Sequence, residues 1–196
     1  MIADKDRSGY FGASDVTMIM GSWKTESFRK WWLQKIGANN DHFDNKFTLA
    51  GTNYEHRILE SLGIPSLKLD EQIIHENLKL RVNYDGTTED CTYECKTFRL
   101  ATAGSVQAWR VPKRYWQQVQ VQMFAKGIHK GQIVAYGLEE ADYDNFLRPI
   151  DPSRLRREDI AYDPVWIAAD FLPRLRILAG CLKQGIMPEE AMKGGR

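Results

Sequence analysis

The chain has 196 residues, of which 43% are hydrophobic, and its formal net charge is +1. This length suits one domain with a sizeable core, so we expect a single domain over residues 1–196. There is no run of about 18 apolar residues and no apolar segment at the N-terminus, which argues against a membrane span and a secretory signal. A near-neutral charge does not by itself predict a nucleic-acid binder, although an acidic cleft can offset a basic rim in the sum.

The first third of the chain is predicted to be helical. A short helix is expected from Ser14 to Gly21, with Ser14 as its N-cap. A second is expected from Thr25 to Ile36, capped by Thr25 and followed by a polar loop over 37–46. A third is expected from about Leu49 to Leu62.

Strands follow the helices. Apolar and polar residues alternate over Glu71–Glu76 and over Leu78–Tyr84, and Asp85-Gly86 is a favoured hairpin turn. Thr92–Phe98 is then the partner strand. The rest of the chain is predicted to contain a loop, a helix, two short strands and a long helix with a kink at Pro173: 99–111, Pro112–Lys126, Gln132–Tyr136, Phe146–Ile150 and Asp163–Gln184. This order predicts an α/β fold with a mixed sheet.

The strand Thr92–Phe98 carries a carboxylate and an ammonium group on one face, because Glu94 and Lys96 are two residues apart. A hairpin could bring Asp85 towards Glu94, and two converging carboxylates form an oxygen site suited to Mg²⁺ or Mn²⁺. The alternative is a solvated ion pair. Acid-x-Lys triplets are common, and a second one, Asp44-Asn45-Lys46, lies in the polar loop.

Five short motifs in order strengthen the catalytic interpretation: Arg7 followed by Ser14-Asp15, Gly51-x-x-x-Glu55, Asp85-Gly86, Glu94-Cys95-Lys96 and Tyr115-x-x-Gln118-Val119-Gln120. Together they resemble the PD-(D/E)xK nucleases and, more narrowly, the lambda exonuclease/YqaJ family of viral recombinases, over about residues 7 to 125. The resemblance implies a restriction-endonuclease-like core, with a mixed central β-sheet flanked by helices. Two positions depart from the usual pattern, Asn83-Tyr84 in place of Ser-Pro and Ala50 in place of Trp, and they affect the pocket shape rather than a metal ligand.

The resemblance also implies residue roles. Asp85, Glu94 and the backbone carbonyl of Cys95 would bind one or two Mg²⁺ (or Mn²⁺) ions, with Glu55 in the outer part of the site. Lys96 would hold the attacking water. Gln118 would lie near the metals, whereas Gln120 is expected to pack against the core or the surface. For Glu55 the alternative is an ordinary glutamate on a helix surface.

Arg7 and Ser14 are candidates for binding a DNA end. A helix N-terminus at Ser14 suits an anion, and an arginine can grip a phosphate bidentately. In the exonuclease that the chain resembles, these positions hold the 5′-phosphate. The alternative is that Ser14 only caps its helix and Arg7 lies in a frayed terminus. Three basic clusters are further candidates for DNA backbone contacts, or else ordinary solvated faces: Lys113-Arg114, Arg154-x-Arg156-Arg157 and Arg174-x-Arg176.

We therefore expect a Mg²⁺-dependent 5′→3′ exonuclease that degrades linear double-stranded DNA and leaves 3′ single strands for phage-type homologous recombination. By the same resemblance, a single-strand annealing protein is the expected partner, and a homotrimer is one expected assembly. The three sparse cysteines suit a cytoplasmic protein, in the host cytoplasm if a phage encodes it. The alternatives are an endonuclease on the same scaffold, a non-catalytic DNA-binding module, and an interaction protein with an incidental ion pair.

Overall fold

The computed structural model describes residues 8–38 and 46–189. Within these residues a five-stranded sheet has the order β1-β2-β3-β4-β5. Strands β3 and β4 run parallel, and the other neighbours run antiparallel, which confirms the mixed sheet. The strands are β1 Lys68–His75, β2 Leu80–Thr87, β3 Cys91–Arg99, β4 Lys130–Leu138 and β5 Leu155–Ala161.

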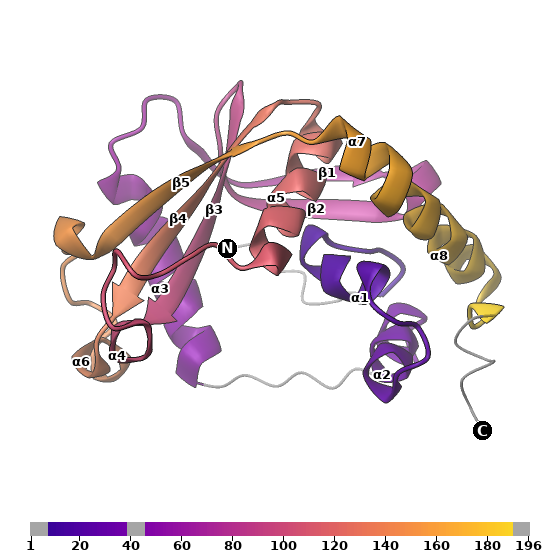
Figure 1. Cartoon of the computed structure of the whole chain (residues 1–196), viewed down its shortest axis with the longest axis horizontal. Coiled ribbons are helices and arrows are strands. Elements are labelled where there is room, and N and C mark those ends of the chain that lie inside the picture. Colours follow the sequence, from indigo (N-terminus) through magenta and orange to yellow (C-terminus); the bar gives the residue numbers. More distant parts are fainter. Residues whose placement is uncertain (1–7, 39–45, 190–196) are drawn as a thin grey trace.

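Helices cover both faces of this sheet (Figure 1). The N-terminal part begins with a 3₁₀ turn at Ala13–Asp15, and a π-helical segment, Ile167–Phe171, lies between the last two helices. The α-helices are α1 Val16–Met20, α2 Glu26–Lys35, α3 Lys46–Ser61, α4 Leu100–Ala103, α5 Lys113–Lys126, α6 Glu140–Asp144, α7 Pro164–Trp166 and α8 Leu172–Gln184.

Helix α5 provides the crossover that two neighbouring parallel strands require. It begins after Pro112 and ends at Gly127, whose φ of 72° is the left-handed conformation that favours glycine. It lies directly on β4, and Gly131 of that strand allows the close approach. A Cβ at this position would collide with the side chains of Val119 and Met123. This close approach brings one face of α5 down onto the neighbouring strand β3.

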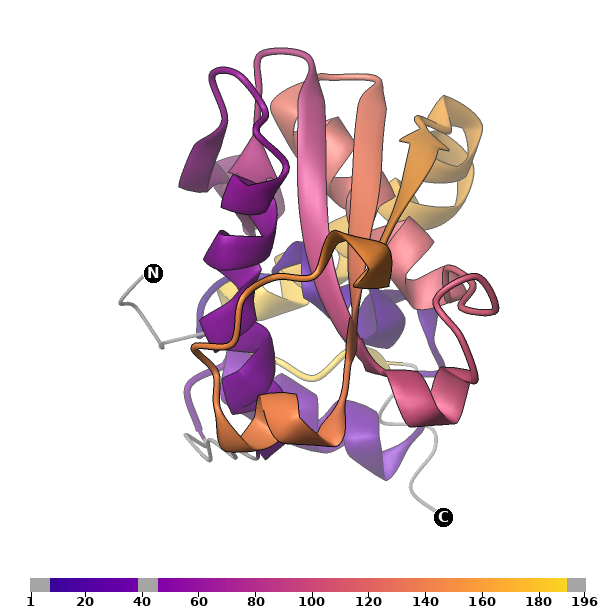
Figure 2. The same ribbon diagram turned by 90° about the vertical axis from the view of Figure 1, so that its left-hand side faces the viewer.

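The two faces of the central strands have different cores. Figure 2 shows α3 and α5 on opposite sides of the strands. On the α3 side, Tyr54, Ile58 and Leu59 form a buried cluster with side chains of β3 and β4. On the α5 side, Val119 and Met123 pack against the other face of β4. Strand β4 is therefore buried on both faces, which explains its nearly continuous apolar sequence.

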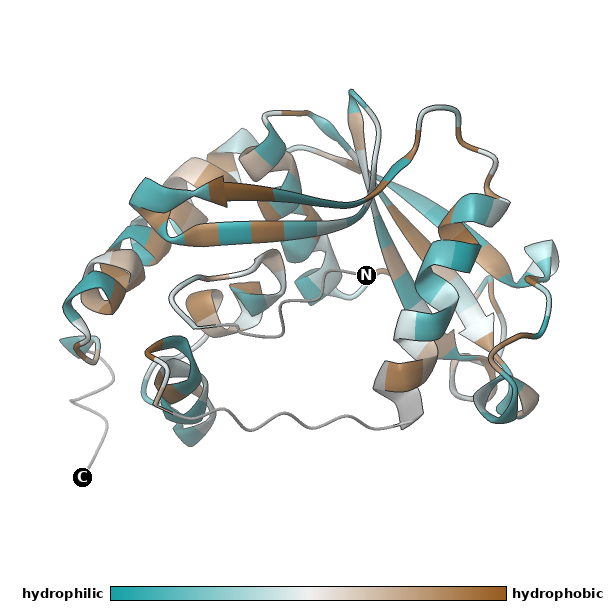
Figure 3. Ribbon diagram, turned by 180° about the vertical axis from the view of Figure 1, so that it is seen from behind, coloured by the Kyte–Doolittle hydropathy of each residue, from teal (hydrophilic) through white to brown (hydrophobic). Residues whose placement is uncertain are grey.

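A third cluster lies around strand β2 and helices α1, α2 and α8. Phe11, Phe28 and Trp32 are fully or almost fully buried in it, together with apolar residues of β2. The alternation of hydrophobic and hydrophilic residues along β2 is visible in Figure 3. Its buried residues face this cluster, so that the intervening residues, among them Asn83 and Asp85, point the other way.

The expected turn at Asp85-Gly86 is wrong. Both residues lie inside β2, where Gly86 pairs with Leu69 on one side and Tyr93 on the other. The chain reverses at residues 88–90, and Thr88 N–H donates to the carbonyl of Cys91 over 2.8 Å. Asp-Gly is compatible with a turn, but here Gly86 serves close packing, since a Cβ would lie 3.1 Å from Leu67.

The strand expected at Phe146–Ile150 is also wrong. The strand of this region is β5, which begins after the Asp151-Pro152 pair rather than ending before it. The backbone carbonyls of Phe146, Leu147 and Arg148 accept hydrogen bonds from the guanidinium of Arg57 on α3 instead of from a neighbouring strand. A single side chain thus replaces the sheet pairing that the local sequence suggested.

Other local expectations are confirmed in part. Thr25 Oγ1 accepts from Phe28 N–H at the start of α2, and the long C-terminal helix is interrupted by the π-helical segment just before Pro173. The segment 99–111 is mostly loop but contains the short helix α4. The N-cap expected at Ser14 is wrong: Gly12 is the N-cap of the 3₁₀ turn, and its N–H donates to the carboxylate of Asp15 over 2.7 Å. Among the described helices, none is long and apolar enough to cross a membrane.

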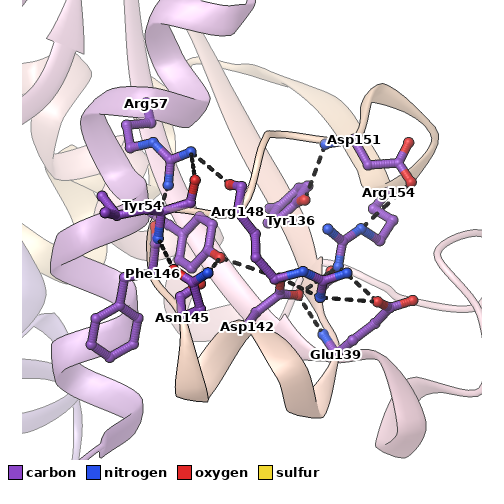
Figure 4. A network of polar contacts seen from close by, with 12 residues as sticks. Tyr54, Arg57, Tyr136, Glu139, Asp142, Asn145, Phe146, Arg148, Asp151 and Arg154 are labelled. Carbon is purple, nitrogen blue, oxygen red and sulfur yellow. Dashed lines mark hydrogen bonds and ion pairs between the residues drawn. The ribbon is translucent and has the colours of Figure 1, made fainter.

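Parts of two basic clusters have structural roles. Arg154 is buried and pairs with the fully buried Asp142 over 2.5 Å, within the polar network of Figure 4. Arg174 donates to the carbonyls of Ile19 and Gly21 and lies over the ring of Trp23. These two arginines hold elements together, so they are not candidates for DNA contacts.

Candidate active site

The candidate site lies where strands β2 and β3 separate. The two strands pair only at Gly86–Tyr93 and Thr87–Thr92. Figure 1 shows β1 and β2 running away from β3, β4 and β5 beyond this point. Asp85 and Glu94 are the next residues along their strands. Beyond the fork, the backbone N–H and C=O groups of β3 that face β2 have no strand partner within the described residues, and they lie between two acidic side chains.

Asp85 fills part of the fork. Its Oδ2 accepts from the backbone N–H of Cys95 over 2.8 Å. Because the N–H and C=O of a strand residue point to the same edge, the carbonyl of Cys95 is directed towards the same opening. The Cys95 side chain instead packs beside α3, and burial raises the pKa of its thiol well above the ordinary value. Cys95 therefore offers its backbone oxygen to the site and not a thiolate.

Glu94 is the most enclosed acid of the site, with 1% of its surface exposed. Its Oε1 accepts from Lys96 Nζ and, over 2.6 Å, from Gln118 Nε2. Its Oε2 accepts from Gln122 Nε2. Lys96 and Glu94 share a face of β3, as expected from their spacing, and the ammonium group of Lys96 also lies 5.1 Å from the ring centre of Tyr115.

The charges of the site act strongly on one another. Burial, followed by the nearby carboxylates of Glu94 and Glu55, raises the pKa of Asp85 well above its ordinary value. Burial and then Glu94 raise the pKa of Glu55 in the same way. Burial alone would lower the pKa of Lys96, but Glu94 and Asp85 outweigh it and the pKa is raised. Three carboxylates around one ammonium group form an environment that favours a further cation.

Glu55 connects the fork to a second group of metal-ligand side chains. It lies on α3 beside His56, whose Nε2 is 3.2 Å from Asp70 Oδ1. Candidate ligand atoms of Glu55, His56 and Asp70 lie within 4.8 Å of one another. They line a pocket of about 340 Å³ together with Asp85, Asn83 and neighbouring residues. Carboxylate oxygens suit Mg²⁺ and Mn²⁺, and the imidazole of His56 adds one nitrogen ligand, so the donor set fits a divalent metal.

A second, smaller pocket of about 100 Å³ lies beside the first and shares Asn83 with it. Its lining includes Ser14, Arg81, Lys35 and Gln118. Lys35 is 3% exposed and pairs with Asp15 over 2.6 Å. This pocket therefore combines the Ser14 hydroxyl and the Arg81 guanidinium with the Asp15–Lys35 ion pair, and it shares Asn83 with the acidic pocket. Arg7, the other candidate for binding a DNA end, lies outside the described residues.

The structure brings together Asp85, Glu94, Lys96, Cys95 and Gln118, and it gives Gln120 a packing role. Gln120 Nε2 donates to the carbonyl of Ala161, and its Oε1 accepts from Asp163 N–H. Sequence reasoning missed His56, Asp70 and Arg81, which line the pockets, and Gln122, which contacts Glu94. Only Gln122 carried a local signal, since it is four residues from Gln118 and so shares its helix face.

The mixed sheet forks between β2, which carries Asp85, and β3, which carries the Glu94-Cys95-Lys96 triplet. This arrangement defines a restriction-endonuclease-like core. Solved structures agree on this fold. The alkaline exonuclease LHK-Exo from Laribacter hongkongensis has a TM-score of 0.73 and 20% identity, and the match covers 95% of both chains. The same enzyme in complex with dAMP has a TM-score of 0.71 with the same identity and coverage. A phage-related exonuclease from Haemophilus somnus 129PT has a TM-score of 0.57 and 15% identity, with 90% of this chain and 96% of that chain covered.

The family follows from the sequence of the same region. The model of the YqaJ-like viral recombinase domain matches residues 4–129, which contain every residue of the acidic site. The chain belongs to the YqaJ-like viral recombinase family. No curated protein matches the chain with significant similarity.

Proposed function

We propose that this protein is a metal-dependent deoxyribonuclease that hydrolyses phosphodiester bonds at the fork of its sheet. The observation that carries the proposal is the convergence of Asp85 and Glu94 from two separating strands, with Lys96 paired to Glu94. A solvated ion pair would not need a 1% exposed glutamate with three donors. Membership in the YqaJ-like family and the exonuclease fold support the same assignment.

Asp85, Glu94 and the carbonyl of Cys95 would hold the metal, one or two Mg²⁺ or Mn²⁺ ions, with Glu55 at the outer side. When bound, the metal would supply a Lewis acid for the phosphoryl oxygens and lower the pKa of an attacking water. The raised pKa of Lys96 keeps its side chain protonated at neutral pH. Lys96 would therefore donate a hydrogen bond to the water and stabilise negative charge developing on the phosphate, rather than remove a proton.

We extend the proposal to a 5′→3′ exonuclease that acts on linear double-stranded DNA, releases 5′-mononucleotides and leaves 3′ single strands for recombination. The pocket lined by Ser14 and Arg81 supports this direction, because it offers an anion site for a terminal phosphate next to Gln118. A related fold bound to dAMP supports a nucleoside monophosphate product. Family resemblance alone supports a single-strand annealing partner and a homotrimer.

The first experiment compares internally labelled linear duplex DNA carrying a 5′-phosphate with a covalently closed circle. Wild type and Glu94→Gln are each assayed with Mg²⁺ and with EDTA. We expect mononucleotides from the linear DNA only, with wild type and Mg²⁺ only. Glu94→Gln should retain less than about 1% of the activity, since losing one electrostatic group of a catalytic site typically costs 10²–10³-fold.

The other outcomes separate the alternatives. Cutting of the circle would favour an endonuclease on the same scaffold, which the fold equally permits. DNA binding without cleavage under Mg²⁺ and Mn²⁺ would favour a non-catalytic DNA-binding module. Unchanged behaviour of Glu94→Gln in both assays would leave the Glu-x-Lys pair as a structural ion pair.

A further inference from the structure

Glu94 accepts a hydrogen bond from a buried residue that the motifs of the family do not include. Gln122, on α5, is fully buried, and its Nε2 donates to Glu94 Oε2. On the other side of the same amide, Thr92 Oγ1 donates to Gln122 Oε1 over 3.4 Å. The amide can face Glu94 only with its NH₂ group, because its oxygen would repel the carboxylate.

The backbone around Gln122 is fixed as well. Tyr84 O–H donates to the carbonyl of Gln122 over 3.0 Å, which ties α5 to strand β2. Thr92 and Glu94 lie on one face of β3, two residues apart. Gln122 therefore contacts β3 at two points and β2 at a third, immediately behind the fork.

The two glutamines of α5 take different oxygens of Glu94. Oε1 accepts from both Lys96 and Gln118, whereas Oε2 accepts from Gln122 alone. A carboxylate oxygen has two acceptor directions, so Oε1 is fully used and Oε2 keeps one direction free. The free acceptor direction of Oε2 is therefore set by the rotation of the Glu94 carboxylate, which the three donors hold.

We propose that Gln122 is a positioning residue that sets the rotation of the Glu94 carboxylate, and thereby the metal affinity of the site. This inference rests on the proposed metal-dependent function. Without the Gln122 donor, Oε2 is a buried acceptor without a partner. The carboxylate would then rotate, or the ammonium group of Lys96 would shift towards Oε2. Loss of a hydrogen-bond partner behind a metal ligand typically costs 10–100-fold in metal affinity.

Helix α5 offers a matched control in Gln120. It is the same residue type on the same helix and is equally buried. Its two hydrogen bonds, to the carbonyl of Ala161 and from Asp163 N–H, are each 2.7 Å long and lie away from the fork. Gln120→Met should therefore lower the melting temperature and leave metal affinity unchanged.

The experiment measures Mn²⁺ binding to the DNA-free protein by isothermal titration calorimetry, beside melting temperatures. Gln122→Met keeps the side-chain length and removes the amide. We expect it to bind Mn²⁺ at least about tenfold more weakly than wild type. Thr92→Val, which removes only the hydroxyl that orients the amide, should weaken binding in the same direction by a smaller factor. DNA cleavage by Gln122→Met should recover as Mn²⁺ is raised.

Equal Mn²⁺ affinity of folded Gln122→Met and wild type would overturn the positioning role. If Gln122→Met does not fold, wild-type affinity in Thr92→Val would overturn it instead. Equal loss of affinity in Gln120→Met would also overturn it, because the effect would then be general loosening of α5. Absence of Mn²⁺ binding by wild type would contradict the proposed metal site itself, a result distinct from the others.

Discussion

At the scale of single residues, burial and mutual repulsion raise the pKa values of two acidic groups of the site, Asp85 and Glu55. The pKa of Asp85 is raised by burial and by the carboxylates of Glu94 and Glu55. The stability that its protonated form contributes is complete below the ordinary aspartate pKa of about 4, and it is lost as the pH rises through the folded-state value. A divalent cation reverses this balance, because it favours the ionised carboxylates.

The corresponding prediction concerns Asp85→Asn in EDTA. The variant should become more stable relative to wild type as the pH rises from about 4, the ordinary aspartate pKa. Melting temperatures of both proteins between pH 4 and pH 8 measure this difference, and added Mg²⁺ should stabilise wild type only. Asp90→Asn is the control, because Lys130 lowers the pKa of Asp90 and no such rise is expected. A pH-independent difference would contradict the raised pKa of Asp85.

At the scale of elements, a buried polar network fixes α3, the helix that carries Glu55. Figure 4 shows Asp142 at its centre, with Arg148 and Arg154 paired to the carboxylate and Tyr54 of α3 bonded to it. Arg57 of α3 donates to the backbone carbonyls of Phe146 and Arg148, in the loop after α6. Glu55 lies between these two anchored residues, so the network sets its distance from the fork.

We predict that Asp142→Ala destabilises the protein by about 3 kcal/mol, because the buried Arg154 loses its closest partner and keeps only longer contacts with Glu139 and Asp151. Urea unfolding measures this loss. The folded fraction should also bind Mn²⁺ more weakly if α3 shifts. Asp90→Ala, which breaks an exposed pair with Lys130, should leave the urea midpoint unchanged. Similar midpoints for Asp142→Ala and wild type would show that the network does not anchor α3.

At the scale of the whole molecule, the two pockets are assembled from distant parts of the chain. Ser14 comes from the N-terminal 3₁₀ turn, Lys35 from α2, Arg81 from β2 and Gln118 from α5. The neighbouring acidic site joins α3, β2 and β3. In the proposed function, a DNA end would place its terminal phosphate in the smaller pocket, beside the metal ligands of the larger one.

Ser14→Ala tests this arrangement. A hydrogen bond to a charged group contributes about 1.5–3 kcal/mol, so we expect the preference for 5′-phosphate over 5′-hydroxyl DNA ends to fall about tenfold. Cleavage rates on the two linear duplexes give the preference. Ser22→Ala, at another exposed serine, should keep it. An unchanged preference in Ser14→Ala would show that Ser14 has only a local structural role. Absence of any preference in wild type would favour an endonuclease.

Most helices and strands, and the order of the acidic motifs, follow from local sequence patterns. Alternation along β3 placed Glu94 and Lys96 on one face, and Thr25 and Gly127 marked helix ends, because these effects act over a few residues. The same local reasoning failed at Asp85-Gly86 and at Phe146–Ile150. There the deciding contacts, Leu67 against Gly86 and Arg57 on the loop carbonyls, come from elsewhere in the chain.

Which side chains complete the site depends on tertiary packing. Gln122 reaches Glu94 because Gly131 lets α5 lie against β4. His56, Asp70 and Arg81 reach the pockets because β2 leaves β3 at the fork. Short-range pattern fixes which face a residue occupies, whereas the distance between two faces depends on packing that involves the whole chain.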